Sequence, residues 1–360
     1  MGRTFEVVDI DLVPVKEFES RTIIVRSFET LKYIDMNLRH KVKRIQIRDG
    51  RNFISQNEIN QITKVLAQDF QHLEHLYIER AELSSVEFLK NIPNLTILRV
   101  TDTDLVDLTP ISCLKKLEVL EVYNNKIKDI DPLRGLLKLH WLDIAGNQVQ
   151  SLKPISGLNL KELKAGDNQF TDLTPLARMV SLEWLSLYQT REGSSKILSI
   201  QPLAGLTNLT HLFIKNNNIK NIWPLQNLTQ LEVLVLSENG IVDIRGLGKL
   251  YSHKTLHLDS NQIWDIKIIS NLQRLTYLNL KDNKKISNVT SLSKLQPGAK
   301  ILVGDKEIYQ SKKRKYEEVV TGPQNGYSCK LEDWSDESDG YFDDDEEIYE
   351  APPSKHRKYF

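Results

Sequence analysis

Short groups of the form apolar-x-apolar recur between residues 42 and 303, and the usual distance from one group to the next is 22 residues. In the copy LEVLEVYNNKIKDIDPLRGLLK, residues 117 to 138, Leu117, Leu120 and Val122 alternate as a short strand requires. Four further apolar residues fill the rest of the copy. A fixed period of this length predicts stacked turns that bury one continuous core. Full turns begin at Leu73, Leu95, Leu117, Leu139, Leu160, Leu182, Leu209, Leu231, His253 and Leu275.

Polar residues also keep their places in this period. The ninth residue of most turns is an amide, whose side chain can donate to and accept from the buried backbone of neighbouring turns. These amides are Asn125, Asn147, Asn168, Asn217, Asn239, Asn261 and Asn283. Prolines fix a tight backbone on the return side, at Pro110, Pro132, Pro154, Pro175, Pro202 and Pro224. We interpret both sets as scaffold.

This pattern resembles the leucine-rich repeat superfamily. The D-I-x-P-L return at residues 129 to 133 resembles the 22-residue subclass shared by bacterial internalins and the leucine-rich regulatory subunits of protein phosphatase 1. The resemblance covers residues 42 to 303. It implies an α/β solenoid, a horseshoe with a parallel concave β-sheet and short 3-10 or irregular returns on the convex side. It also implies protein recognition, with a phosphatase catalytic subunit as one partner.

The chain divides into three parts: an N-terminal cap region, 1–41, the leucine-rich repeat solenoid, 42–310, and a tail, 311–360. Residues 27 to 38 have helical spacing and could shield the first turn. Ser55 and Glu58 form a capping box that opens a helix, and Ile59, Ile62, Val65, Leu66 and Phe70 lie on one side of it. Five extra residues after Thr190 lengthen one later turn, as a tolerated loop or as a segment that folds over a partner.

The tail changes the charge pattern. The whole chain holds 48 Lys or Arg and 48 Asp or Glu, but residues 332 to 350 carry eleven acidic residues and no basic one, which predicts disorder. The basic residues Lys312, Lys313, Arg314 and Lys315 form a candidate nuclear import signal. Ser335 and Ser338 are candidate phosphosites in acidic surroundings. The alternative hypothesis is therefore a nuclear acidic adaptor that binds basic proteins through its tail, as the acidic leucine-rich nuclear phosphoproteins suggest.

Composition bounds the compartment and the partners. Two cysteines cannot supply disulfide-rich caps, which favours a reducing compartment, cytoplasmic or nuclear. A signal peptide and an apolar run of membrane-spanning length are both missing, so neither membrane insertion nor internalin-like adhesion is favoured. The charge balance does not favour nucleic acid as a partner. A monomer that binds a protein or peptide, and no small-molecule substrate, is the expectation.

The strand pattern also predicts the binding face. When the fourth and sixth residues of a turn point into the core, the third, fifth and seventh point out from the concave sheet. This rule places two tryptophans, Trp141 and Trp184, about 10 Å apart on one exposed surface, with a shallow notch at Ala145 and Gly166 between them. Such a patch is typical of the centre of a protein interface. The predicted partner-binding residues are Tyr123, Trp141, Asp143, Lys164, Trp184, Tyr188, His211 and Phe213.

Catalytic alternatives are weaker. The neighbouring carboxylates Glu121 and Asp143 could hold a cation or share a proton, but charged residues at the rim of an interface are commoner. We interpret His211 and His257 as solvated histidines, because the sequence places no nucleophile beside them. P-loop, paired-cysteine zinc and G-x-S-x-G motifs are absent from the sequence. We therefore expect a non-enzymatic recognition scaffold with neither cofactor nor metal.

Overall fold

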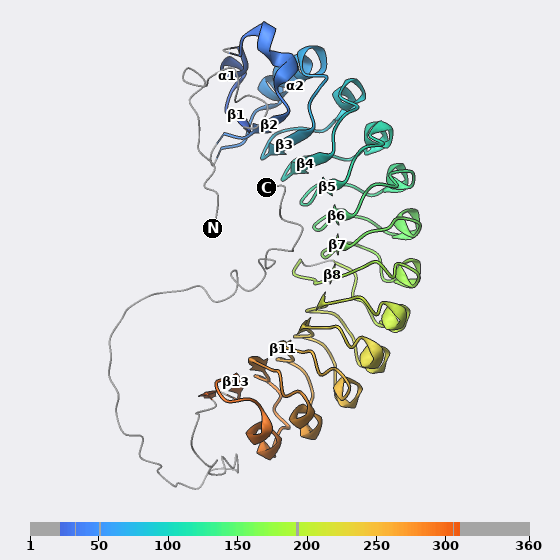
Figure 1. The fold of residues 1–360 in the computed structure, drawn as a ribbon, viewed down its shortest axis with the longest axis vertical. Helices are drawn as coiled ribbons and strands as arrows, with labels where there is room; N and C mark the ends of the chain where they lie inside the picture. The colour runs from blue at the N-terminus through green and yellow to red at the C-terminus, as the bar shows by residue number, and fades with distance from the viewer. Residues whose placement is uncertain (1–21, 33, 50–51, 192–193, 305, 310–360) are drawn as a thin grey trace, which may run out of the picture. The chain divides into compact units, whose positions relative to one another are not determined.

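The computed structural model describes residues 22–32, 34–49, 52–191, 194–304 and 306–309. These residues form one 14-stranded sheet in which the spatial order of the strands follows the sequence order. Strands β1 to β13 pair in parallel, and β14 pairs antiparallel with β13. The strands lie along the inner side of a curved stack of turns (Figure 1). The predicted leucine-rich repeat solenoid with a parallel concave sheet is confirmed.

The strands are short. They are β1 (Ile23–Val25), β2 (Arg44–Ile47), β3 (His75–Glu79), β4 (Ile97–Thr101), β5 (Val119–Glu121), β6 (Trp141–Asp143), β7 (Glu162–Lys164), β8 (Trp184–Ser186), β9 (His211–Phe213), β10 (Val233–Val235), β11 (Thr255–His257), β12 (Tyr277–Asn279), β13 (Lys300–Val303) and β14 (Lys306–Tyr309).

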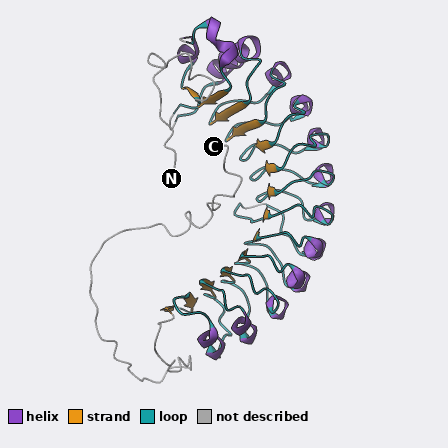
Figure 2. Cartoon of the chain, viewed as in Figure 1, coloured by secondary structure: helices purple, strands orange, loops and turns teal. Residues whose placement is uncertain are grey.

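The convex side carries one short 3-10 helix in almost every turn, as Figure 2 shows. These helices are η4 (Glu87–Asn91), η5 (Thr109–Cys113), η6 (Asp131–Leu133), η7 (Lys153–Ile155), η8 (Thr174–Leu176), η9 (Gln201–Gly205), η10 (Trp223–Asn227), η11 (Arg245–Leu247), η12 (Lys267–Asn271) and η13 (Thr290–Lys294). Proline stands in the first turn of η5 to η10, where its missing N–H costs no hydrogen bond.

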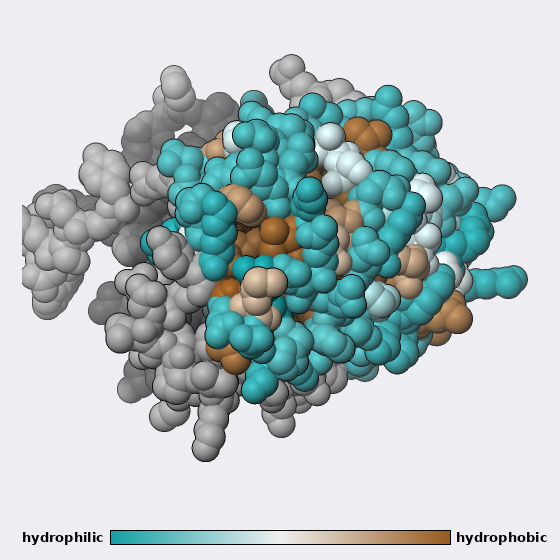
Figure 3. Space-filling view, turned by 90° about the horizontal axis from the view of Figure 1, so that it is seen from above, coloured by the Kyte–Doolittle hydropathy of each residue, from teal (hydrophilic) through white to brown (hydrophobic). Residues whose placement is uncertain are grey.

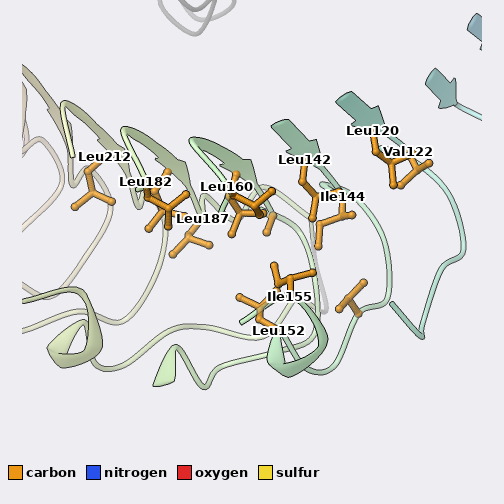
Figure 4. Close-up of a cluster of buried hydrophobic side chains, with 14 of the residues drawn as sticks. Leu120, Val122, Leu142, Ile144, Leu152, Ile155, Leu160, Leu182, Leu187 and Leu212 are labelled. Atoms are coloured by element: carbon orange, nitrogen blue, oxygen red, sulfur yellow. The ribbon is translucent and has the colours of Figure 1, made fainter. Parts of the chain in front are cut away.

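A single core fills the space between the sheet and these helices. Figure 4 shows Leu142 and Ile144 from the strand side facing Leu152 and Ile155 from the return side. All four are buried, and the same arrangement repeats from turn to turn. Each turn therefore buries its apolar residues against its own return path and against its two neighbours.

The asparagine ladder is confirmed. The Asn168 side-chain amide donates to the carbonyl oxygens of Ile144, Ala165 and Gly166 at 2.9, 3.1 and 3.0 Å, and its Oδ1 accepts from Val149 N–H at 2.9 Å. One side chain thus satisfies backbone groups in two turns. The other six asparagines of the predicted set also donate to the preceding turn.

A second polar ladder is visible only in the structure. Four residues after most ladder positions, an Asp, Asn or Ser side chain accepts a hydrogen bond from the backbone N–H two residues further on. Asp129 does so at 2.8 Å from Asp131 N–H, and Asn221 at 3.0 Å from Trp223 N–H. These short local bonds start the 3-10 helices, so the polar residues of the return path are scaffold as well.

The N-terminal end closes the stack with helices. Strand β1 pairs with β2, so the sheet begins within the segment that the sequence assigns to the cap. The expected helix over residues 27 to 38 is shorter in the structure, as α1 (Phe28–Lys32) followed by the 3-10 helix η3 (Met36–Lys41). The capping-box helix is confirmed as α2 (Gln56–Asp69), whose N-cap Ser55 accepts from Glu58 N–H. Figure 3, which looks down on this end, shows a mainly hydrophilic surface with small hydrophobic groups.

Candidate functional site

The predicted binding residues come together on the concave side of strands β5 to β9. Trp141, Glu162 and Trp184 are register partners on three successive strands. The alternate residues Leu142, Leu163 and Leu185 are fully buried in the core, so the tryptophans point away from it. Both rings therefore belong to the concave side, as the alternation predicts.

A row of charged residues crosses β4 to β7 at the fifth position of each turn. Arg99 Nε lies 2.8 Å from Glu121 Oε2, and Lys164 Nζ lies 3.9 Å from Asp143 Oδ2. Glu121 and Asp143 are register partners in the middle of this row. We call Arg99, Glu121, Asp143 and Lys164 the charge row. Each of its carboxylates has a cation on its outer side.

Asp143 is the most perturbed member of the charge row. Burial raises the pKa of Asp143 from 3.8 to about 6, whereas Lys164 and the Ala145 N–H lower it. That N–H donates to Asp143 Oδ1 at 3.0 Å. The described residues contain no group of three metal-ligating side chains. The row is therefore an arrangement of ion pairs, in which the two central carboxylates are held by different cations.

An aromatic cluster occupies the next two strands. The Trp184 ring stacks on His211, with centroids 4.3 Å apart and planes 20° apart, and it lies 4.8 Å from the Phe213 centroid. We call Trp184, His211 and Phe213 the aromatic cluster. Only 8% of Trp184 and 3% of Phe213 are exposed. The expectation that Trp184 stands out in water is wrong, because its neighbours on β9 cover it.

The expectation of solvated histidines is wrong for His257 and holds only in part for His211. His211 is half-buried in the aromatic cluster, and burial lowers its pKa from 6.5 to about 4. His257 is buried and stacks on Tyr277 at 4.8 Å, and burial lowers its pKa as well. Both rings are neutral at physiological pH and act as flat packing surfaces.

Half-buried side chains surround these buried ones. Trp141 is part-exposed, and Lys164 Nζ lies 5.8 Å from its ring centroid in a cation–π contact. Tyr123 and Tyr188 are also half-buried. The predicted notch is filled at Gly166, because a Cβ placed there would lie 2.5 Å from the Tyr188 carbonyl oxygen and 3.3 Å from its ring. Glycine at this position lets Tyr188 pack closely against the strand edge.

Thr190 and Arg191, at the start of the lengthened turn, bind back to preceding turns. The Asp167 carboxylate accepts from the N–H groups of Thr190 and Arg191, at 2.5 and 3.0 Å. The Arg191 guanidinium donates to Gly146 O at 3.0 Å and to Asn124 Oδ1 at 2.7 Å. Thr190 and Arg191 are therefore bound to the three preceding turns.

Several predicted sites lie outside the described residues. They are the candidate import signal Lys312, Lys313, Arg314 and Lys315 and the candidate phosphosites Ser335 and Ser338. Among the residues that are described, no helix has the length and apolar character needed to cross a bilayer.

Comparisons with known proteins place this geometry in a family. The family described as Leucine Rich repeats (2 copies) matches residues 93–135 and 207–249. The structure of internalin InlF from Listeria monocytogenes is similar at 26% identity and a TM-score of 0.62, over 82% of this chain and 89% of that chain. No curated protein sequence matches the chain.

Two other solved structures share the fold. A leucine-rich repeat protein from Leptospira interrogans is 21% identical over 77% of this chain and 88% of its own, with a TM-score of 0.51. The plant peptide hormone receptor RGFR1, solved in complex with RGF2, is 19% identical over 75% of this chain and 49% of its own, with a TM-score of 0.55. Leucine-rich repeat proteins are in general non-enzymatic scaffolds that bind proteins or peptides. The chain is a leucine-rich repeat protein of the 22-residue class, with internalins among its structural neighbours.

Proposed function

We propose that the protein recognises a protein or peptide on the concave side of strands β5 to β9 and catalyses no reaction there. One observation carries this proposal: a rigid parallel sheet presents part-exposed rings and one cation above a buried floor. The part-exposed groups are Tyr123, Trp141, Lys164, Tyr188 and His211, and the floor is Asp143, Trp184 and Phe213.

The two layers have different tasks. Part-exposed aromatic side chains bury a large area on contact and lose little conformational entropy, which makes them effective interface anchors. The stacked floor fixes the orientation of the part-exposed side chains above it. These side chains therefore lose little further conformational entropy when a partner binds.

The test is quantitative affinity purification with the full chain. Trp141→Ala should weaken partner binding by about 2 kcal/mol, roughly 30-fold, while the variant stays folded. Tyr251→Ala removes an exposed ring at a position outside the concave strands and is the matched control. Equal recovery of partners by the wild type and Trp141→Ala would disprove the assignment of the site.

A phosphatase catalytic subunit is the narrower proposal, which rests on the sequence resemblance to phosphatase regulatory subunits. Purified catalytic subunit should bind the wild type and lose affinity for Trp141→Ala. If it binds neither protein, the phosphatase proposal fails, although recognition of another partner on the same strands is untouched.

Internalin-type recognition outside the cell is a second candidate, favoured by the 26% identity to InlF over 82% of the chain. The two candidates differ in compartment, because the phosphatase proposal requires a cytoplasmic or nuclear protein. Fractionation of source cells with an antibody against the native protein separates them. Recovery only from the medium or the cell surface would favour the internalin-type role.

A further inference from the structure

Large exposed apolar side chains gather at one place on the flank of the solenoid, away from the concave strands. Leu198 is 66% exposed, Trp223 45%, Val242 42% and Trp264 57%. They come from four consecutive turns, just before or at the start of the 3-10 helices. Other exposed apolar residues of the repeats do not join this group. Val106 lies four turns before Leu198, and Leu137, Val180 and Tyr251 stand near the ends of their turns, after the 3-10 helices.

Backbone hydrogen bonds hold these four turns in register. Asn218 N–H donates to Ile197 O at 3.0 Å, Gly240 N–H to Ile219 O at 2.9 Å, and Gln262 N–H to Ile241 O at 2.9 Å. The residues that follow these three acceptors therefore lie in one row across the turns. Trp264 extends the row, because it follows Ile263, the equivalent residue of the next turn. The row reads Leu198, Lys220, Val242 and Trp264.

Trp223 lies three residues beyond Lys220 in the same turn. Its backbone N–H donates to Asn221 Oδ1 at 3.0 Å, which fixes the start of η10 beside the row. We call Leu198, Lys220, Trp223, Val242 and Trp264 the flank patch. Two tryptophans, two aliphatic residues and a lysine thus stand at or just before the start of the 3-10 helices in four consecutive turns.

The charge around the flank patch is positive. Lys220 and Lys267 are exposed, as are Lys284 and Lys285 in the next turn, and none of them forms an ion pair with another described residue. The two nearby carboxylates are engaged locally. Asp243 Oδ2 lies 2.6 Å from Arg245 Nη2, and Asp265 Oδ1 accepts from Lys267 N–H at 3.0 Å.

The size of the flank patch limits what it can bind. Three steps of about 4.8 Å give a row of about 14 Å, the length of four or five extended residues. Four partly exposed side chains offer on the order of 400 Å² of apolar surface, if each fully buried aromatic supplies about 150 to 250 Å². A stable interface between folded partners needs about 800 Å² on each side. The area suits a peptide segment better than a second folded copy.

We propose that the flank patch is a second interaction surface, which binds a short acidic segment with aromatic or aliphatic side chains from a partner protein. The apolar side chains of the segment cover Trp223, Val242 and Trp264, and its carboxylates pair with the surrounding lysines. Charge attraction speeds the encounter and selects acidic sequences, whereas the indole rings supply most of the affinity.

The probe for this proposal is a fluorescent peptide with the sequence of residues 331 to 350, LEDWSDESDGYFDDDEEIYE, which has the required composition. Fluorescence anisotropy measures its binding to the full-length protein. We expect Trp264→Ala to weaken binding roughly tenfold and the pair Lys220→Glu and Lys267→Glu to weaken it by at least as much. Tyr251→Ala, an exposed aromatic outside the patch, should bind as the wild type does. Circular dichroism verifies that each variant is folded.

Three results would overturn the proposal. The first is equal peptide affinity for the wild type and both flank variants. The second is a loss of affinity in Trp141→Ala and not in Trp264→Ala, which would move peptide binding to the concave side. The third concerns the acidic residues of the chain itself, Asp343, Asp344, Asp345, Glu346 and Glu347. If replacing them with Asn or Gln strengthens peptide binding tenfold, the chain's own acidic segment competes with the peptide. That segment, and not a separate partner, would then be the ligand of the flank patch.

Discussion

On strands β4 to β7 the fifth position of each turn is charged, whereas on β8 to β10 it carries Ser186, Phe213 and Val235. The backbone is the same in both regions, with one parallel strand per turn and the same register. In the charge row, buried carboxylates are held by cations from neighbouring strands. In the aromatic cluster, stacked rings partly cover a histidine. One rigid sheet thus presents two chemically different surfaces side by side.

The two regions also shift the pKa values of their titratable groups in opposite directions. The charge row holds an aspartate whose proton is retained up to about pH 6, and the aromatic cluster holds a histidine whose proton is lost above about pH 4. Burial causes both shifts, since it disfavours the charged form of an acid and of a base alike. Near pH 5, Asp143 and His211 are therefore both mainly uncharged.

The largest effect should come from the floor of the aromatic cluster. Trp184→Ala removes a buried ring that packs on His211 and Phe213, and should lower the free energy of unfolding by about 3 to 5 kcal/mol. Trp264→Ala, an exposed tryptophan on the flank, should change it by less than about 0.5 kcal/mol. Urea denaturation of both variants measures the difference. Similar midpoints would show that the cluster adds nothing to the fold.

The charge row should respond to the loss of one cation. Arg99→Met leaves the buried Glu121 carboxylate without its partner at 2.8 Å, and should cost about 3 kcal/mol of stability. Lys254→Met breaks an equally short pair with Glu232, 2.7 Å, but both of these side chains are exposed. The control should lose less than about 1 kcal/mol in the same denaturation measurement. Equal losses would mean that burial does not distinguish the charge row from a surface pair.

The two regions should also differ in the sign of their pH dependence. The native pKa of Asp143, about 6, lies above its usual 3.8, so its contribution to stability falls as pH rises from 4 to 6. The native pKa of His211, about 4, lies below its usual 6.5, so its contribution is lost as pH falls from 6.5 to 4.

Non-titrating variants isolate these contributions. Relative to the wild type, Asp143→Asn should gain about 2 kcal/mol of stability between pH 4 and pH 6. As the pH falls from 6.5 to 4, His211→Phe should gain about 1 kcal/mol of stability relative to the wild type. This value includes a discount for the partial exposure of His211. Denaturation midpoints at pH 4, 5, 6 and 7 measure both. Profiles parallel to that of the wild type would contradict the assigned pKa shifts.

The period of the sequence was sufficient for the strands and the asparagine ladder, because both depend only on which residues recur. It could also have located β1, since Ile23 and Val25 stand 22 residues before their register partners Ile45 and Ile47. The intervening segment hides this signal because it forms helices and carries no repeat. The helical segment between residues 27 and 38 was overestimated in length for the same reason, as spacing alone does not show where a short helix ends.

The exposure of the concave side chains could not be predicted from alternation. The pattern gives the side of the sheet but not the direction of each ring along it. Trp184 is covered by residues 27 and 29 positions later, and the position of Gly166 is filled by a tyrosine of the next turn. Burial here depends on side-chain conformations in neighbouring turns. The two bulky rings at the third and fifth positions of the turn after Trp184 were the signal that could have revealed it.

The smallest expected effect is at Lys164, the last residue of the charge row, which lies over the Trp141 ring and near the Asp143 carboxylate. Lys164→Met keeps much of the side-chain volume and loses only the charge, so at pH 4, where Asp143 is protonated, stability should change by less than about 1 kcal/mol. Lys164 lowers the pKa of Asp143, so its removal should move that pKa further up. A carbon-detected NMR titration of the Asp143 carboxyl measures this shift directly.

The control is Lys161→Met, which removes an exposed ion pair with Glu183 beside β7. It should leave the midpoint of the Asp143 titration unchanged. An unchanged Asp143 midpoint in Lys164→Met would show that the 3.9 Å contact carries no electrostatic coupling, and the charge row would then end at Asp143.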